Sequence, residues 1–246
     1  MKFYKSLHPR KVRGPGKLNT LPKHIAIIPD GNRRWARDRG LKPWDGHKVG
    51  AGLTEKMIDW CFIKYDIPHI TVYGLSIENL KKRPKTELNR LMNIYKRQFR
   101  KLAKDERVHK HKIKVQVLGD ISKFPKDVAD AINYAMEKTK TYKKHILTFL
   151  MPYSGRYEIV KAIKDISKNG FKNLTEKNFS QYLLTNGIGD PDLIIRTAER
   201  RMSNFMLWQS AYSEIFFMDK YWPDFALRDL ENVLEEFSER ERNFGE

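Results

Sequence analysis

Short apolar runs alternate with amphipathic stretches over most of the chain. The apolar runs are rich in β-branched residues and predict strands at 24–28, 69–75, 113–119, 145–151, 192–196 and 214–217. Between them, apolar residues recur every three or four positions and predict helices at 46–64, 84–104, 126–140, 157–167 and 226–241. Strands that alternate with helices are joined by βαβ crossovers, which make neighbouring strands parallel. The pattern therefore predicts an α/β fold with a central, mostly parallel six-stranded sheet flanked by helices.

Three polar loops follow predicted strands. The first and fifth apolar runs, "HIAII" and "DLIIR", are nearly continuous, which is typical of strands covered on both faces. Ligands of open parallel sheets bind beyond the carboxyl ends of the strands. "PDGN", "SIEN" and "RTAERRMSN", which follow the first, second and fifth strands, are therefore expected along one edge of the sheet. We expect the functional site at this edge.

The chain divides into a short basic segment and one domain. Residues 1–22 are basic, contain Pro and Gly and show no sustained period, so we expect an extended arm. No Pro-, Gly- or Ser-rich linker interrupts the remainder, which favours a single domain over 23–246. No apolar run reaches the roughly 18 residues that a membrane-spanning helix needs. We expect a cytoplasmic protein.

Charge and cysteine content narrow the classes of function. The chain has 48 Lys+Arg against 30 Asp+Glu, a net charge of +18. Such an excess attracts phosphates in nucleic acid, in lipid headgroups or in a small substrate, although it often serves only solubility. The sole cysteine, Cys61, excludes an internal disulfide and argues against a Cys-based zinc site; its apolar surroundings indicate packing.

The "PDGN" loop has the residues of an anion site. Asp30 offers one hard oxygen, which suits Mg²⁺ because that ion usually takes one or two protein carboxylates and keeps water and phosphate oxygens. Gly31 lets the backbone approach a ligand, and Asn32, Arg33 and Arg34 are placed to hold a leaving pyrophosphate. The alternative is a tight turn followed by a solvated basic helix.

Further polar residues are expected beside this loop. His47 in "GHKVG" can donate to a second phosphate oxygen, or it has a structural role. The loops after the second and fifth strands add Ser76, Glu78, Asn79, Arg83, Arg196, Arg200, Arg201 and Ser203. Two arginine clusters at one edge indicate two phosphorylated ligands side by side. The P-loop, dinucleotide and zincin motifs are absent from the sequence.

Taken together, these stretches closely resemble the cis-prenyltransferase family, also called the undecaprenyl diphosphate synthase family. The resemblance covers nearly the whole chain from His24 and lies in "HIAIIPDGNRRWA", "GHKVGA", "TVYGLSIENLKKRPKTE", "YSGRYEIV", "DPDLIIRT", "RMSNFMLWQSAYSEIFF", "WPDF" and "RERNFG". The chain lacks the Asp-Asp-x-x-Asp motif of the trans-prenyltransferases, which carry out related chemistry on an all-helical fold.

The resemblance implies a homodimer and an apolar tunnel between sheet and helices. It implies Mg²⁺-dependent condensation of isopentenyl diphosphate onto an allylic diphosphate of the farnesyl or geranylgeranyl type, which makes a Z-polyprenyl diphosphate. Asp30 and Glu214 match the metal residues, and Asp30, Asn32, Ser76 and Asn79 are the expected catalytic residues. The allylic site is expected at Gly31, Asn32, Arg33, Arg34, His47 and Arg83, and the acceptor site at Arg196, Arg201 and Ser203.

Several positions depart from the family pattern, most of them around the acceptor site. Pro43 and Asn243 stand where arginines are usual, Leu80 replaces a tryptophan, and a glycine is missing after Thr197. The "Asn-Tyr-Gly-Gly-Arg" motif reads Pro-Tyr-Ser-Gly-Arg at 152–156. Two alternatives therefore stay open: a non-standard acceptor, either a second allylic diphosphate or a phosphorylated alcohol, and a non-catalytic subunit of a hetero-oligomer.

The positive charge raises the question of two further partners, nucleic acid and membrane. No nucleic-acid-reading motif accompanies it, so we expect no nucleic-acid partner. A polyprenyl product must pass from the enzyme to a bilayer, and polybasic segments gain about 1 kcal/mol per Lys or Arg at an anionic surface. We expect either a reversible membrane contact by the arm at 1–22 or a solvating tail.

Overall fold

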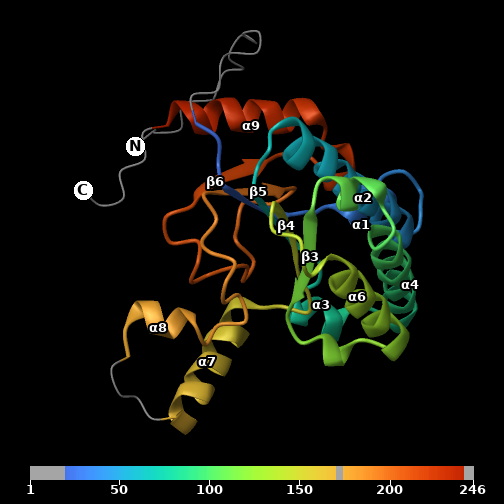
Figure 1. Cartoon of the computed structure of the whole chain (residues 1–246). Helices are drawn as coiled ribbons and strands as arrows, with labels where there is room; N and C mark the ends of the chain where they lie inside the picture. The colour runs from blue at the N-terminus through green and yellow to red at the C-terminus, as the bar shows by residue number, and fades with distance from the viewer. Residues whose placement is uncertain (1–19, 170–173, 241–246) are drawn as a thin grey trace, which may run out of the picture.

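A six-stranded parallel sheet forms the centre of the protein. The structure, a computed structural model, describes residues 20–169 and 174–240 (Figure 1). The strands run in the order β3-β4-β2-β1-β5-β6, and all neighbours are parallel. Their bounds are β1 His24–Ile28, β2 His69–Tyr73, β3 Ile113–Leu118, β4 His145–Leu150, β5 Leu193–Thr197 and β6 Glu214–Met218. The predicted fold class is confirmed, and each strand lies within two residues of its expected bounds.

Helices flank the sheet along the described chain. They are α1 Asn32–Arg37, α2 Pro43–Met57, α3 Ile77–Lys82, α4 Lys85–Leu102, α5 Glu106–Lys110, α6 Lys126–Thr139, α7 Gly155–Asn169, α8 Glu176–Ser180 and α9 Leu227–Glu239. The helix expected at 46–64 begins earlier, because proline is favoured in the first helical turn, and it ends in the π-helix Ile58–Lys64. The pattern does not predict α3, α5 and α8, since five or six residues are too few to show a period.

The two faces of the sheet pack against different hydrophobic cores. Ile25 and Ile27 of β1 belong to the larger core with α2, α4, α6 and α9, whereas Ala26 and Ile28 pack in a smaller core that includes Phe205. Alternate residues of a strand point to opposite faces, so a strand covered on both sides is apolar throughout. In Figure 1, α4 and α6 lie together on one side of the sheet, while α7 and α8 project away from it.

The strand order creates a crevice at one edge of the sheet. From β1 the chain crosses to β2 on one side, and β5 later pairs with β1 on the other side. Such a switch point leaves the loops after the two strands apart and open to a ligand. The loop at Pro29 and the loop after Thr197 therefore flank one crevice.

Three smaller expectations concern the basic arm, membrane spans and the cysteine. The arm predicted at 1–22 lies outside them up to residue 19, so its contact with membranes stays a prediction. Within 20–169 and 174–240, none of the helices is both long enough and apolar enough to cross a bilayer. Cys61 is buried, and burial raises the pKa of its thiol, as expected of a packing residue.

A buried carboxylate joins α7 to the segments that follow it. Glu158 has no exposed surface, and its Oε2 accepts hydrogen bonds from the N–H and the Oγ1 of Thr185 at 3.3 and 3.0 Å. Its Oε1 accepts from the Tyr153 hydroxyl and from Gln209 Nε2. Burial raises the pKa of Glu158, and these hydrogen bonds act against that shift. The carboxylate thus has four donors and connects three separate segments.

We expect Glu158→Ala to lower the free energy of unfolding by about 2–4 kcal/mol, because four donors lose their acceptor and a cavity forms. Urea denaturation measures the change. Glu137→Ala is the matched control, since the Glu137 side chain on α6 is 66% exposed and should cost little. Equal stability of the two variants would contradict the interpretation.

Candidate active site

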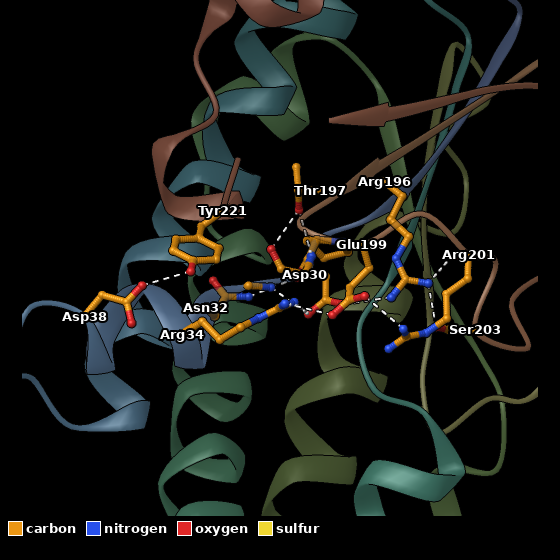
Figure 2. Close-up of polar contacts among 12 residues, drawn as sticks. Asp30, Asn32, Arg34, Asp38, Arg196, Thr197, Glu199, Arg201, Ser203 and Tyr221 are labelled. Carbon is orange, nitrogen blue, oxygen red and sulfur yellow. Dashed lines mark hydrogen bonds and ion pairs between the residues drawn. The ribbon is translucent and has the colours of Figure 1, made fainter. Parts of the chain in front are cut away.

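Asp30 lies at the crevice, directly beyond β1. Its N–H donates to Thr197 Oγ1 at 2.9 Å, and the Thr197 hydroxyl donates to the Asp30 carbonyl at 2.8 Å, which joins the loops after β1 and β5 (Figure 2). Its Oδ2 accepts from Arg196 Nη2 at 2.8 Å, while Oδ1 accepts from the Gly31 N–H at 2.6 Å. The carboxylate is 36% exposed, so it is fixed in direction and still accessible to a ligand.

The glycine after Asp30 is required by its surroundings. Gly31 has φ 96°, and a Cβ there would lie 2.6 Å from Cδ1 of Tyr221. No side chain caps α1, which begins at the next residue. Because Gly31 N–H already binds Asp30, the donors left for a ligand begin with the first turn of α1. The N–H groups of Asp30 and Gly31 are both engaged within the protein, at Thr197 Oγ1 and at Asp30 Oδ1.

Asn32 is part of the packing between α1 and α2. Its Nδ2 donates to the Pro29 carbonyl at 3.0 Å, and a Cβ on Gly50 would lie 2.1 Å from its Oδ1. Within the described residues, this buried Oδ1 has no hydrogen-bond partner. In this arrangement Asn32 stabilises the shape of the loop that carries Asp30.

Arg196 holds the second loop in place. It is 2% exposed, and its Nη1 donates both to the Arg201 carbonyl and to Ser203 Oγ (Figure 2). The same guanidinium binds Asp30, so the predicted metal residue and the predicted acceptor residues meet at one side chain. Arg196 Nε is buried and has no partner among the described residues, and a phosphate oxygen or water can satisfy such a donor.

A carboxylate bridges the two predicted diphosphate sites. Glu199 Oε1 lies 2.7 Å from Arg34 Nη1, and its Oε2 lies 2.8 Å from Arg201 Nη1. Arg34 also lies 3.6 Å from Asp30 Oδ1 and over the ring of Tyr221, 5.7 Å from its centroid. Arg34 and Arg201, which are expected at the allylic and acceptor sites, are therefore held side by side with one acidic residue between them.

His47 and Arg83 form a second group at the start of α4. Arg83 Nη1 lies 3.0 Å from His47 Nε2, and because a guanidinium only donates, this nitrogen accepts and the imidazole proton is on Nδ1. Burial lowers the pKa of His47, and the Arg83 and Arg33 charges act in the same direction, against the 3.5 Å contact with Glu87. His47 is therefore neutral, and its Nδ1–H is left as a donor for a phosphate oxygen.

Glu87 is the buried counter-charge of this group. It is 4% exposed and lies 3.4 Å from Arg83 and 3.3 Å from Arg33.

Ser76 and Asn79 belong to α3, where Ser76 Oγ accepts from the Asn79 N–H at 3.0 Å and caps the helix. Both predicted catalytic residues of α3 border the cavity described next.

One cavity of about 960 Å³ joins most of these groups and is bordered by Asp30, Asn32, Arg34, His47, Arg83, Arg196, Glu199, Arg201 and Ser203. Its polar end is bordered by residues of the loops after β1, β2 and β5. Its other end is apolar and lies between the sheet and the helices α2 and α4, with a lining that includes Ala51, Ile58, Val72, Leu91, Ile94, Phe99, Leu102, Leu147 and Phe149. The cavity agrees with the expected apolar tunnel.

Glu214 does not join Asp30 within one chain. It begins β6 and pairs with Arg240, whereas Asp30 follows the carboxyl end of β1 at the opposite edge of a parallel sheet. The described residues contain no cluster of three potential metal ligands. A single accessible carboxylate fits Mg²⁺ that takes its other ligands from water and diphosphate. Of the two carboxylates that the sequence predicts at the metal, Asp30 is the one that borders the cavity.

The departures from the family pattern have different places. Pro43 is the first residue of α2 and borders the cavity. Ala198, at the missing glycine, has φ 68° and adopts the left-handed conformation that glycine favours. Asn243 lies outside the described residues.

Four residues that surround the site are not predicted as functional groups from the sequence. Thr197, Glu199 and Tyr221 surround the Asp30 loop, and Glu87 lies beneath His47. Glu87 falls within an amphipathic helix, where a glutamate normally indicates the solvent face. The only available signal was its position four residues after Arg83, a spacing that brings helix side chains together.

Comparison with known proteins agrees with this geometry. Residues 28–245 match the family described as "Putative undecaprenyl diphosphate synthase". A geranylgeranyl-diphosphate-specific tritrans,polycis-undecaprenyl-diphosphate synthase of Methanopyrus kandleri is 42% identical over 99% of this chain and 90% of that protein. The synthase of the same name from Pyrococcus horikoshii is 43% identical over 93% and 89%.

A solved structure is similar in both sequence and fold. Lavandulyl diphosphate synthase from Lavandula x intermedia, in complex with dimethylallyl diphosphate, has a TM-score of 0.84 and 34% identity, over 92% of this chain and 99% of that one. The family match spans most of the chain, and the relatives exceed 40% identity across nearly all of it. The protein therefore belongs to the undecaprenyl diphosphate synthase family and is a cis-prenyltransferase.

Proposed function

We propose that the chain condenses isopentenyl diphosphate onto an allylic prenyl diphosphate in a Mg²⁺-dependent reaction and makes a Z-polyprenyl diphosphate. The observation that carries the proposal is the cavity, whose cationic end continues into an apolar arm along α4. A polyprenyl diphosphate has the same division between a charged head and an apolar chain. The archaeal relatives are named for geranylgeranyl diphosphate, which makes it the first allylic substrate to test.

The allylic diphosphate binds with its head at Arg34, His47 and Arg83. Breaking the allylic C–O bond moves negative charge onto the leaving pyrophosphate, and preorganised cations and N–H donors stabilise that charge where it develops. Asp30 would hold Mg²⁺, which would supply positive charge to the leaving pyrophosphate at the same place. The neutral His47 contributes a hydrogen bond without a second unit of charge.

The acceptor diphosphate binds at Arg196, Arg201 and Ser203. Its double bond attacks the allylic carbon that loses pyrophosphate, a carbon–carbon bond forms, and a proton then leaves the adduct. The Asn32 amide is engaged with the Pro29 carbonyl and packed against Gly50, which favours Asp30 or the released pyrophosphate over an Asn32-held water as the base for this proton.

A second candidate keeps the donor chemistry and changes the acceptor to a second allylic diphosphate or a phosphorylated alcohol. It is favoured by Ala198, which alters the acceptor turn at a position of positive φ. The similar lavandulyl diphosphate synthase is described with dimethylallyl diphosphate, an allylic compound.

The experiment incubates the purified chain with radiolabelled isopentenyl diphosphate, Mg²⁺ and farnesyl, geranylgeranyl or dimethylallyl diphosphate. Label should pass into the organic phase, and chelation of Mg²⁺ should stop the transfer. Products from two allylic diphosphates without isopentenyl diphosphate would support the second candidate. Activity of this chain alone would exclude a non-catalytic subunit, and no transfer with any pair would overturn the proposal.

We expect Asp30→Asn to reduce the rate of label transfer by roughly 10²–10³-fold or more, since it removes the metal-binding charge and keeps an oxygen for Arg196. The control is Asp127→Asn, the same change at an ion-paired carboxylate on α6. Initial rates at saturating substrates and thermal melting separate catalysis from stability. A wild-type rate in Asp30→Asn would contradict the role of Asp30.

The apolar arm is expected to limit product length. Phe99 lies on α4, about 20 Å along the helix from its start beside Arg83, and packs edge-to-face on Phe149 at 5.2 Å. Phe99→Leu should shift the products to longer chains by removing bulk from the arm. Phe62→Leu is the control, because Phe62 is equally buried and does not border the cavity. Mass spectrometry of the extracted products measures their chain lengths. An unchanged length distribution in Phe99→Leu would contradict the role of the apolar arm in limiting product length.

We propose a homodimer formed through exposed apolar residues of β6 and α7. β6 is an edge strand, Phe217 on it is 37% exposed, and Val160 and Ile163 on α7 are 51% and 46% exposed, one turn apart. Edge strands and exposed apolar faces favour association. Light scattering should give the dimer mass, and Val160→Glu should weaken the dimer more than Val49→Glu, the same change on α2. A monomeric wild type would refute this.

A further inference from the structure

The Ser154 hydroxyl lies between the segment after β2, which contains Glu78, and the turn after β5, which contains Asn204. Ser154 precedes α7 and is 3% exposed. Its Oγ donates to Glu78 Oε1 at 3.1 Å and accepts from Asn204 Nδ2, which also donates to Glu78 Oε1 at 2.8 Å. Three side chains from three separate segments therefore form a closed triangle of hydrogen bonds.

Asn204 is held on every side. Its Oδ1 accepts from the Arg156 N–H at 2.8 Å, and its carbonyl accepts from the Gly155 N–H at 2.7 Å. Asn204 and the preceding Ser203 have φ values of 63° and 48°. Residues other than glycine adopt this left-handed conformation at a cost, and it persists where the surroundings impose it. The shape of the turn at 201–204 thus depends on contacts from outside it.

The triangle connects the two substrate sites. On one side of the turn, Arg196 binds the Arg201 carbonyl and Ser203 Oγ. On the other side, Asn204 binds Glu78 in the first turn of α3, the helix that ends beside Arg83. The acceptor turn is therefore fastened to the helix that leads into the allylic site.

Glu78 is an anion in this triangle. Burial alone would raise its pKa, but hydrogen bonds from its own N–H and from Asn204, Ser154 and Ser76 outweigh burial and hold the pKa of Glu78 below its usual range. Hydrogen bonds to a charged acceptor are stronger than those between neutral groups. The two donors are thus firmly bound at neutral pH.

We propose that Ser154 is a positioning residue, which with Asn204 and Glu78 fixes the Arg201–Ser203 turn for the acceptor diphosphate. A glycine, which the family motif has at this position, has no hydroxyl for either bond, so the contact depends on the serine of this chain. The inference rests on the proposed function, because it concerns the acceptor site of that reaction.

The test separates the acceptor from the allylic substrate. Ser154→Ala removes the hydroxyl, and Asn204→Gly removes the side chain while keeping a residue that accepts positive φ. Each should raise the KM for isopentenyl diphosphate roughly three- to ten-fold, as expected for one or two lost hydrogen bonds, with a much smaller change in the KM for the allylic substrate. Ser238→Ala, which removes a hydroxyl bonded to the Glu235 carbonyl on α9, is the matched control.

Two further variants identify the contact itself. The double variant of Ser154 and Asn204 should raise the acceptor KM no more than the larger single effect, because residues in one hydrogen-bond network are not additive. Glu78→Gln keeps an oxygen for both donors but removes the charge that strengthens their bonds, so it should raise the acceptor KM less than Glu78→Ala, which should resemble Ser154→Ala. Additive single effects, or equal KM changes for both substrates, would overturn the inference.

Hydrogen exchange supplies a readout that needs no turnover. Backbone amides of 201–206 should exchange faster in Ser154→Ala than in the wild type and in Ser238→Ala. If the wild type transfers no label, the proposed function fails whatever the exchange shows. If the wild type is active and both the acceptor KM and the exchange are unchanged in Ser154→Ala, this inference alone is wrong.

Discussion

The site depends on the ion pair between Asp30 and Arg196. Arg196 is almost completely buried, and a buried guanidinium without a counter-charge costs several kcal/mol, about 3–5 when a partner is removed. Its Nη2 therefore fixes Asp30 at 2.8 Å, while its Nη1 binds the Arg201 carbonyl and Ser203. The planar guanidinium of Arg196 thus sets the distance between the Asp30 loop and the turn at 201–203.

The carboxylates around this pair determine where the remaining cations lie. Glu199 holds Arg34 and Arg201 next to each other, and Glu87 holds Arg83 and Arg33. Arginine side chains lose much conformational freedom on binding a diphosphate unless they are already in position. A diphosphate competes with Glu199 and Glu87 for these arginines. It finds the cations already close to the positions where negative charge would develop on the leaving pyrophosphate. The same carboxylates also limit mutual repulsion while no ligand is bound.

The sequence predicts the loops of the site better than it predicts their connections. Asp30 follows β1, Arg196 lies near the carboxyl end of β5, and Arg83 follows β2 after the short helix α3. The carboxyl ends of parallel strands share one edge, so the proximity of these residues follows from the strand pattern. Glu87 looks like a surface residue of an amphipathic helix, and nothing in the sequence indicates the left-handed turn at Asn204. Glu214 was expected beside Asp30, but β6 runs parallel to β1 and begins at the other edge. Contacts between distant segments depend on register and side-chain direction, which hydrophobic periodicity does not report.

The topology also explains why a charged site and an apolar arm occupy one cavity. Because all strands are parallel, their polar loops gather at one edge, while the apolar residues of β2 and β4 lie under α2 and α4 along the length of the sheet. Under the proposed reaction the diphosphate head stays at the Asp30 edge, since the cations that stabilise it are fixed there. Each addition then lengthens the product at its head, and the apolar tail moves further along α4. Under the same proposal the arm stabilises the growing chain by apolar burial, and the length of the arm limits how long that chain can become.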